Sequence, residues 1–199
     1  MKITKLEPQK RKAGRYNLEV DDKFSCGLDE ALITELNLYV GKEITDKVLR
    51  KIQETDDYHK CLNKAFSLVS IRMNSESELR KKLAKKFGYK TINKVISRLK
   101  ELGYVNDELF VKNWIQAREN SRGRYLLKKE LRQKGIEKEL IDKFLVSRNN
   151  ETELENARLI MAKKKWPEMT REEKYQKVGG YLARRGFDYE TIKQVINEM

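Results

Sequence analysis

The sequence is poor in the side chains that build metal sites, disulfide scaffolds and membrane spans. Its 199 residues contain two cysteines, Cys26 and Cys61, and a single histidine, His59. This inventory argues against a Cys/His metal site and against a disulfide framework. The longest apolar run, Leu159 to Ala162, has four residues, far short of the ~20 that cross a bilayer. No apolar segment follows the first five residues, so we predict a cytoplasmic protein with no secretory signal and no membrane contact.

Catalytic motifs are equally scarce. His59 lies on a helical pattern beside Tyr58, where a surface or core role is favoured over catalysis. Gly179-Gly180 lacks the surroundings of a phosphate-binding glycine loop. The acidic stretch Glu172-Glu173-Lys174 fits a helix start better than a nuclease site. We therefore predict a protein that is not an enzyme, with no catalytic residues, no metal and no cofactor.

The positive charge is confined to one part of the chain. Overall, 44 Lys+Arg face 31 Asp+Glu, for a formal net charge of +13. Residues 1–61 hold 12 basic and 12 acidic side chains, whereas residues 62–199 hold 32 and 19 and so carry the whole excess. A field confined in this way indicates a polyanionic partner. A solvated, lysine-rich helical surface would give the same composition.

The neutral first part predicts a strand, a hairpin and short helices. Apolar residues alternate on both sides of Asp21-Asp22-Lys23, as they do in half-buried strands. A three-residue loop there would pair Val20 with Phe24, Leu18 with Cys26, and Tyr16 with Leu28. Helical spacing follows in Leu28, Leu32 and Leu36, and a further short helix is expected after Thr45, its predicted N-cap.

A similar segment recurs three times in the basic part, with a period of about fifty residues. Each copy has an apolar pair four residues apart, then basic residues, a glycine and an apolar residue. The copies are Leu79–Tyr89, Leu127–Ile136 and Val178–Phe187. Gly88, Gly135 and Gly186 are expected to adopt the left-handed turn that ends a helix. A further helix follows each glycine, and another is expected before each copy, near 58–73, 107–120 and 152–165.

These elements predict a mainly α fold of three tandem three-helix repeats, forming an elongated curved array after a small β-hairpin-containing N-terminal region. The predicted domains are residues 1–54, 55–107, 108–150 and 151–199. Capping boxes are expected at Ser75/Glu78, Thr152/Glu155 and Thr170/Glu173. Net charges of +7, +5 and +1 for residues 62–107, 108–150 and 151–199 place the expected polyanion surface on the first two repeats.

Exposed cations of the repeats are the candidate site residues, because such groups neutralise phosphates or pair with acidic partners. They are Arg80, Lys81, Lys85, Lys86, Arg118, Arg122, Arg124, Lys128, Lys129, Arg132, Arg184 and Arg185. Tyr104, Trp114 and Tyr125 lie among them, and their helical positions favour core packing over base stacking.

Several stretches with consistent spacing resemble the RecX family of bacterial recombination regulators. They include Leu79–Leu83, Leu99–Asp107, Glu130–Ile136 and Leu182–Tyr189. The resemblance covers residues 55–199, and the front of the chain, with Ile3–Glu7 and the hairpin, resembles the N-terminal extension of Gram-positive members. Phe87 before Gly88 and the pair Gly179-Gly180 depart from the family pattern.

The resemblance implies a non-catalytic monomer that binds in the groove of the filament formed by RecA on single-stranded DNA. There it would inhibit recombinase activity, ATP hydrolysis and co-protease function in recombination and the SOS response. Weak, sequence-independent binding of single-stranded DNA would accompany this role. The alternative is a basic helical-repeat transcription or nucleoid protein, because tandem three-helix units can place a helix in a major groove.

Overall fold

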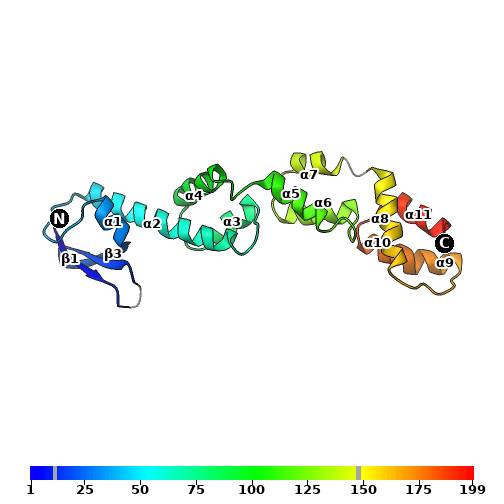
Figure 1. Cartoon of the computed structure of the whole chain (residues 1–199), viewed down its shortest axis with the longest axis horizontal. Coiled ribbons are helices and arrows are strands. Elements are labelled where there is room, and N and C mark those ends of the chain that lie inside the picture. Colours follow the sequence, from blue (N-terminus) through cyan, green and yellow to red (C-terminus); the bar gives the residue numbers. More distant parts are fainter. Residues whose placement is uncertain (11–12, 147–148) are drawn as a thin grey trace. The chain divides into compact units, whose positions relative to one another are not determined.

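The computed structural model describes residues 1–10, 13–146 and 149–199. The chain divides into two compact units (Figure 1). Unit 1 comprises Met1–Arg72 and Arg80–Leu102, and unit 2 comprises Met73–Leu79 and Gly103–Met199. Among the described residues, no helix is both long enough and apolar enough to span a bilayer.

Unit 1 begins with a three-stranded antiparallel sheet, visible at the N-terminus in Figure 1. Its strands, β1 (Ile3–Pro8), β2 (Arg15–Val20) and β3 (Lys23–Asp29), follow one another in sequence order, and α1 (Glu30–Glu35) comes next. A cluster of buried apolar side chains from the sheet, α1 and the following helix forms the core: Ile3, Leu18, Val20, Leu28, Leu32, Leu38, Ile44 and Ile52.

The turn between β2 and β3 has two residues, so the predicted three-residue loop is wrong. Asp21 and Asp22 have φ values of 48° and 61°, as the two-residue type I′ turn requires. With only two residues in the turn, Val20 pairs with Lys23 and not with Phe24. A bulge further along β3 then shifts the register by one residue. The bulge leaves Phe24 65% exposed while Val20 stays buried. The two remaining predicted pairs are confirmed: Leu18 with Cys26, and Tyr16 with Leu28.

A single 24-residue helix, α2 (Asp46–Val69), replaces the two separate helices expected after Thr45 and near 58–73. Thr45 is its N-cap as predicted, and its side chain accepts a hydrogen bond from the Val48 amide. The segment contains no glycine or proline that would interrupt a helix. The predicted domain boundary after residue 54 therefore falls inside α2.

The second and third helices of the first repeat are α3 (Glu76–Leu83) and α4 (Tyr89–Glu101). Ser75 Oγ accepts a hydrogen bond from the Glu78 amide at 3.1 Å, as a cap at this position would. Gly88 has φ −73° and is the N-cap of α4, so the left-handed turn predicted there is wrong.

The second repeat consists of α5 (Asp107–Gln116), α6 (Arg124–Gln133) and α7 (Lys138–Leu145). Its core is a single apolar cluster drawn from all three helices: Phe110, Val111, Ile115, Leu127, Leu131, Ile136, Ile141 and Leu145. Gly135 has φ +74°, which confirms the predicted left-handed turn between α6 and α7.

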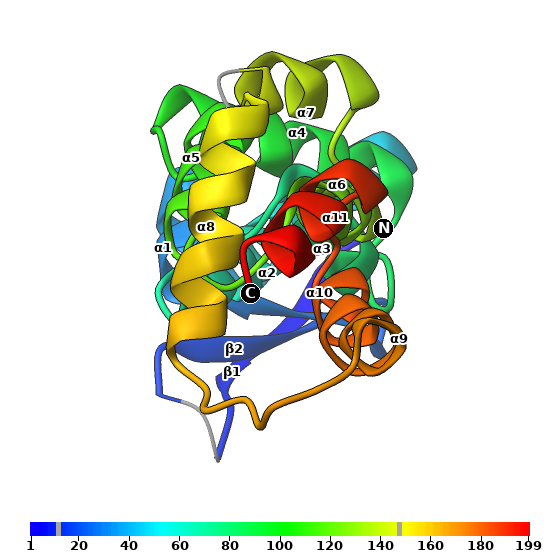
Figure 2. The same cartoon turned by 90° about the vertical axis from the view of Figure 1, so that its right-hand side faces the viewer.

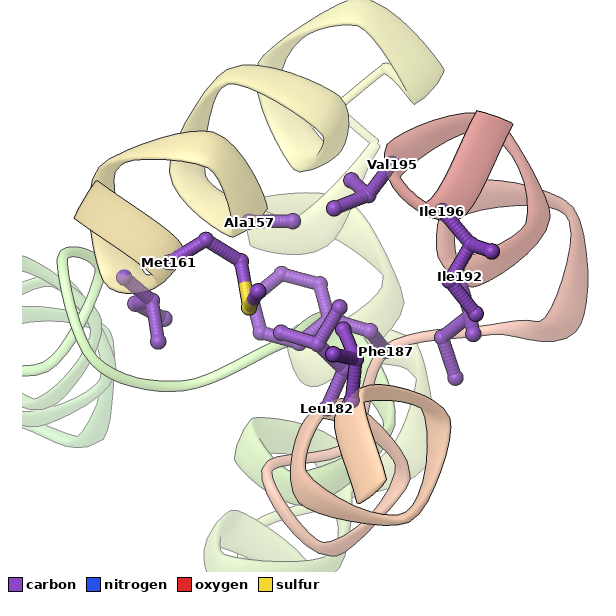
Figure 3. Close-up of a cluster of buried hydrophobic side chains, with 9 residues drawn as sticks. Ala157, Met161, Leu182, Phe187, Ile192, Val195 and Ile196 are labelled. Carbon is purple, nitrogen blue, oxygen red and sulfur yellow. The ribbon is translucent and has the colours of Figure 1, made fainter. Parts of the chain in front are cut away.

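The third repeat contains α8 (Asn150–Ala162), a segmented middle helix and α11 (Tyr189–Asn197). The middle helix runs through α9 (Arg171–Lys174), a π-helical turn (Tyr175–Gly179) and α10 (Gly180–Arg184). Figure 2 shows α8 beside α11, and Figure 3 shows the side chains that α8, α10 and α11 bury together, including Met161, Leu182 and Ile196.

Two start signals of this repeat were predicted, and one is confirmed. Thr170 and Glu173 form a capping box. The predicted box at Thr152/Glu155 is wrong, because α8 begins three residues earlier than an N-cap at Thr152 would place it, and Asn149 accepts the hydrogen bond from the Thr152 amide. Gly186 has φ +85°, so the left-handed turn predicted there is confirmed. The three tandem three-helix repeats and the small β-containing front are confirmed as well.

The left-handed turn of the third repeat packs directly on the start of α6. The Gly123 amide donates to the Arg185 carbonyl at 2.8 Å, and the Tyr125 amide donates to the Gly186 carbonyl at 3.0 Å. Amides at a helix start have no partner within the helix. The turn of one repeat therefore caps the middle helix of the repeat before it.

The turn of the second repeat meets the start of α3 in a related way. Ser75 Oγ donates to the Lys134 carbonyl at 2.6 Å, and Lys134 Nζ pairs with Glu78 at 2.8 Å. Gly135 lies so close to Ser77 that a Cβ on this glycine would fall 2.3 Å from the serine Cβ. Each of these two turns thus locks onto the preceding middle helix.

Candidate nucleic-acid and filament interface

One face of α6 presents a row of cations and an aromatic ring. Leu127 and Leu131 are fully buried and hold the helix against the core of the second repeat. Residues three, four and seven positions apart share a helix face, and four such residues point away from that core: Tyr125, Lys128, Lys129 and Arg132. We call this set the α6 stripe.

Two surface hollows adjoin the α6 stripe. The α6–α7 hollow has a volume of about 340 Å³ and is lined by Arg124, Tyr125, Lys128, Asp142, Leu145 and Val146. The second hollow is lined by Tyr125, Lys128, Lys129, Arg132 and Gln133. Tyr125 and Lys128 therefore belong to both, and the tyrosine ring, 64% exposed, stands at their common edge.

The cations of the α6 stripe differ in how they are neutralised. Lys128 Nζ donates to Asp142 Oδ1 at 2.5 Å. The hydrogen bond from Lys128 lowers the pKa of the Asp142 carboxyl below its ordinary value. Lys129 and Arg132 are exposed, and neither forms an ion pair with any residue that the structure describes. Exposed ion pairs contribute little, so a phosphate can compete with Asp142 for Lys128 and need not break an ion pair to bind Lys129 or Arg132.

Two predicted site residues of the second repeat are instead held in a structural network. The Arg118 guanidinium lies 3.5 Å from the centroid of the Trp114 ring. Arg118 and Arg122 both pair with Glu130, at 3.6 Å and 3.4 Å. The same carboxylate accepts a hydrogen bond from Trp114 Nε1 at 3.0 Å. These arginines fasten α5 and the loop after it to α6.

Arg124 joins the second repeat to the third. Its amide donates to the buried Glu153 carboxylate at 2.9 Å, and its guanidinium lies 3.5 Å from Asp188. The side chain also lines the α6–α7 hollow. Its main contacts are therefore within the protein.

In the third repeat, Arg185 stacks at 3.7 Å on the ring of Tyr181, whereas Arg184 is exposed. Lys164 lies over two rings at once, 4.5 Å from the centroid of Trp166 and 5.2 Å from that of Tyr181. Sequence reasoning missed this cluster, because Trp166 lies in the loop between α8 and α9, outside the helical repeat pattern.

The predicted cations of the first repeat lie at the end of α3 and just beyond it. Arg80 is half-buried and donates to Asn93 Oδ1 at 2.6 Å, which ties α3 to α4. Lys81, Lys85 and Lys86 are exposed. These residues belong to unit 1 and those of the α6 stripe to unit 2.

The aromatic residues among the cations divide differently from the prediction. Trp114 is half-buried and stacks on Phe110, as a core residue does. Tyr104 and Tyr125 are exposed, so the expectation that they belong to the core is wrong. For Tyr125 a signal existed in the sequence: it shares the spacing of the cations at 128, 129 and 132 and not that of Leu127 and Leu131.

Within the described part of the chain, no three His, Cys, Asp or Glu side chains are grouped closely enough to hold a metal ion. Burial raises the pKa of the Cys61 thiol to about 11. A thiol with so high a pKa is almost wholly protonated near neutrality and is a poor nucleophile.

Family models match four successive segments of the chain. The model of the regulatory protein RecX N-terminal domain matches residues 1–45. Models of the first, second and third three-helix domains of RecX match residues 61–99, 106–145 and 151–196.

Full-length relatives and solved structures agree with these models. The chain is 36% identical to regulatory protein RecX of Clostridioides difficile, over 99% of this chain and 95% of the relative. It is 34% identical to regulatory protein RecX of Clostridium tetani, over 100% of this chain and 94% of that one. A crystal structure of regulatory protein RecX has a TM-score of 0.68 at 26% identity, covering 100% of this chain and 99% of the other. The fold is also that of RecX from Lactobacillus salivarius, with a TM-score of 0.61 at 21% identity, over 72% of this chain and 97% of that one.

Proposed function

The chain belongs to the RecX family of regulatory proteins, and we propose that it regulates RecA by binding the filament that RecA forms on single-stranded DNA. Binding in the filament groove inhibits recombinase activity, ATP hydrolysis and co-protease function. The protein contributes no chemistry of its own and needs no cofactor. It acts in the cytoplasm as a monomer.

The observation that carries this proposal is the α6 stripe. Its three cations stand on one exposed helix face in the basic half of the chain, and two of them have no carboxylate partner among the described residues. Single-stranded DNA presents a row of phosphates, and a row of cations on one helix face matches it. Arg118, Arg122 and Arg124 give weaker support, because Glu130 and Asp188 already hold their guanidinium groups.

The test is to change Lys128, Lys129 and Arg132 together to Ala. Each exposed ionic contact contributes ~0.5–1 kcal/mol, so three should raise the concentration for half-inhibition of the RecA ATPase on single-stranded DNA by about tenfold or more. The melting temperature should fall only slightly, since the three side chains lie outside the core and the variant loses only the ion pair of Lys128 with Asp142. If this variant melts normally and inhibits like the wild type, the α6 stripe is a solvated face.

A matched control comes from the neutral part of the chain. Lys47, Arg50 and Lys51 are exposed on α2. Changing all three to Ala removes the same charge from one helix face, and inhibition should be unaltered. If both triple variants lose inhibition equally, net charge alone explains the effect. A strong preference for one duplex sequence would instead favour the transcription or nucleoid alternative.

A further inference from the structure

We propose that the α6–α7 hollow is a base-binding site for single-stranded nucleic acid, in which one base stacks on Tyr125 while the strand continues along the lysines and arginine of the α6 stripe. The inference rests on the proposed function, because the strand is the one carried by the filament. It adds a contact with a nucleobase, which charge alone would not provide.

The shape and lining of the hollow suit a planar ring. Tyr125, 64% exposed, forms one wall, and Leu145 with the 79% exposed Val146 supplies an apolar surface from the end of α7. The volume of about 340 Å³ lies within the range of small-ligand sites, which are mostly apolar with a few polar groups. Proteins that bind single strands combine such an aromatic platform with a cationic track.

The cationic track begins at the hollow. Lys128, Lys129 and Arg132 follow Tyr125 along the same helix face, and the distance along the axis from residue 125 to residue 132 is ~10 Å. This is about three steps at the 3.4 Å spacing of stacked bases. The track lets the phosphates of neighbouring nucleotides contact cations while one base occupies the hollow.

Phosphate binding must come from these side chains, because the start of α6 is already occupied. A helix N-terminus with unpaired amides binds anions. Here the amides of Gly123, Arg124 and Tyr125 donate to Arg185, Glu153 and Gly186 of the third repeat. These three amides at the N-terminus of α6 are therefore not available to an anion, and the strand must lie along the exposed face of the helix.

The lining favours a nucleic acid over an acidic peptide. An acidic peptide gains from the cations but has no use for an exposed ring facing an apolar wall. Asp142, which also lines the hollow, repels a peptide carboxylate but can accept a hydrogen bond from a base, for example from the N3–H of thymine. The polyanion that matches the ring, the apolar wall and the track together is a single strand.

Tyr189 provides a matched control within the chain. Its ring is 63% exposed at the first position of α11. Its sequence neighbours are the acidic Asp188 and Glu190, and one exposed cation, Lys193, follows it on its helix face, in place of the three cations that follow Tyr125. Exposure without a cationic track should not bind a strand.

The experiment measures fluorescence anisotropy of the full-length protein with two labelled oligomers of equal length, oligo(dT) and an abasic strand with the same number of phosphates. Tyr125→Ala should weaken oligo(dT) binding by about 5- to 100-fold, the range of one base–aromatic stack, and abasic binding by less than about twofold. Tyr125→Phe, which keeps the ring, should bind both like the wild type, as should Tyr189→Ala. Circular dichroism confirms that each variant is folded.

Two results would overturn the inference. In one, Tyr125→Ala binds oligo(dT) like the wild type, and in the other it loses both oligomers equally, so that no base contact is involved. If it binds both normally and yet fails to inhibit RecA ATPase, the hollow contacts protein and not the strand. A failure of the proposed function gives a different result. Tyr125→Ala still weakens oligo(dT) binding selectively, but the Lys128, Lys129 and Arg132 triple variant inhibits the RecA ATPase like the wild type.

Discussion

Gly123→Ala should destabilise the protein by ~3–5 kcal/mol, although the backbone at this position suits alanine. Its φ of −78° and ψ of 164° are ordinary extended values. A Cβ there would lie 2.4 Å from the Gly186 oxygen and 2.6 Å from the Phe187 nitrogen. Both are backbone atoms of the third repeat's turn, so neither can rotate away. The methyl group must push the turn off the start of α6.

The magnitude follows from what that displacement breaks. Two hydrogen bonds join the turn to α6, from the Gly123 amide to Arg185 and from the Tyr125 amide to Gly186. Each contributes ~1 kcal/mol, and forcing an added methyl into a packed site costs ~1–3 kcal/mol. Together these contributions amount to ~3–5 kcal/mol.

Two further glycines separate this steric cost from backbone strain. Gly103 has φ +76° and open space around its Cβ position, so Gly103→Ala should cost only the ~1 kcal/mol of a left-handed alanine. Gly186 has φ +85°, and its Cβ would lie 2.3 Å from the Leu126 nitrogen. Gly186→Ala combines both penalties and should be the most damaging of the three.

Urea unfolding followed by tryptophan fluorescence measures the free energy of unfolding of the three variants. The signal reports on unit 2, because Trp114 and Trp166 both lie there. The Tyr125 amide donates to the Gly186 carbonyl in the turn of the third repeat. Its hydrogen-exchange rate is therefore an independent measure of how readily this contact between the repeats opens. If Gly123→Ala is no more destabilising than Gly103→Ala, the close backbone contact between the repeats is not present in solution, and the reasoning fails.

Two other predictions concern charged groups. Asp56 is 1% exposed and pairs with Arg15 at 3.2 Å and with Lys60. Removing one partner of a buried ion pair costs ~3–5 kcal/mol, and the cost here is smaller because Arg15 still pairs with Asp29 at 2.7 Å. Asp56→Ala should therefore lower the urea midpoint followed by circular dichroism, and its exposed neighbour variant Asp57→Ala should not; equal midpoints would contradict this. Lys128→Ala should raise the pKa of Asp142 in an NMR titration, because the Lys128 hydrogen bond lowers it. Since the folded pKa is depressed, the pair's contribution to stability is present above the unfolded pKa near 4 and is lost as the pH falls through the lower folded value; an unchanged Asp142 titration would show that the pair does not form.

The repeat architecture could be predicted because three copies of one pattern supported each other. Apolar pairs four residues apart, at Leu127/Leu131 for example, became buried core positions. Left-handed glycines were placed correctly at Gly135 and Gly186, where chemistry allows few other residues. The excess of positive charge in residues 62–199 likewise indicated the helical part as the cationic region.

The errors arose where a local signal had two solutions. Asp21 and Asp22 tolerate left-handed backbone, so a two-residue turn with a bulge competes with a three-residue loop, and the bulge decides which side Phe24 faces. Asn149 and Thr152 are both good caps, and the earlier one is used. The break expected between two helices after Thr45 has no glycine or proline to support it, and the helix continues as α2 to Val69.

Individual cations of the candidate site could be found from the sequence, but their partners could not. The sequence predicts both Arg118 and Lys129 to be exposed cations of a helical repeat. Only the fold shows that Arg118 lies on Trp114 beside Glu130 while Lys129 faces solvent. Glu130 is 12 residues away from Arg118 in the sequence, and contacts between helices follow from packing rather than from local pattern.

The contacts between successive repeats explain why Gly88 lacks the left-handed backbone of Gly135 and Gly186. We call each contact between a turn and the middle helix of the preceding repeat a joint. Gly135 and Gly186 each turn a chain that locks onto the middle helix of the preceding repeat. The turn after α3 follows the β-containing front, so no three-helix repeat precedes it and no joint has to form. Gly88 is accordingly extended and open to solvent, with nothing within 4 Å of its Cβ position. The same logic isolates the α6 stripe: the start of α6 is occupied by a joint and its buried face by the core, which leaves the exposed face of Tyr125, Lys128, Lys129 and Arg132 as the part of α6 that can bind a partner.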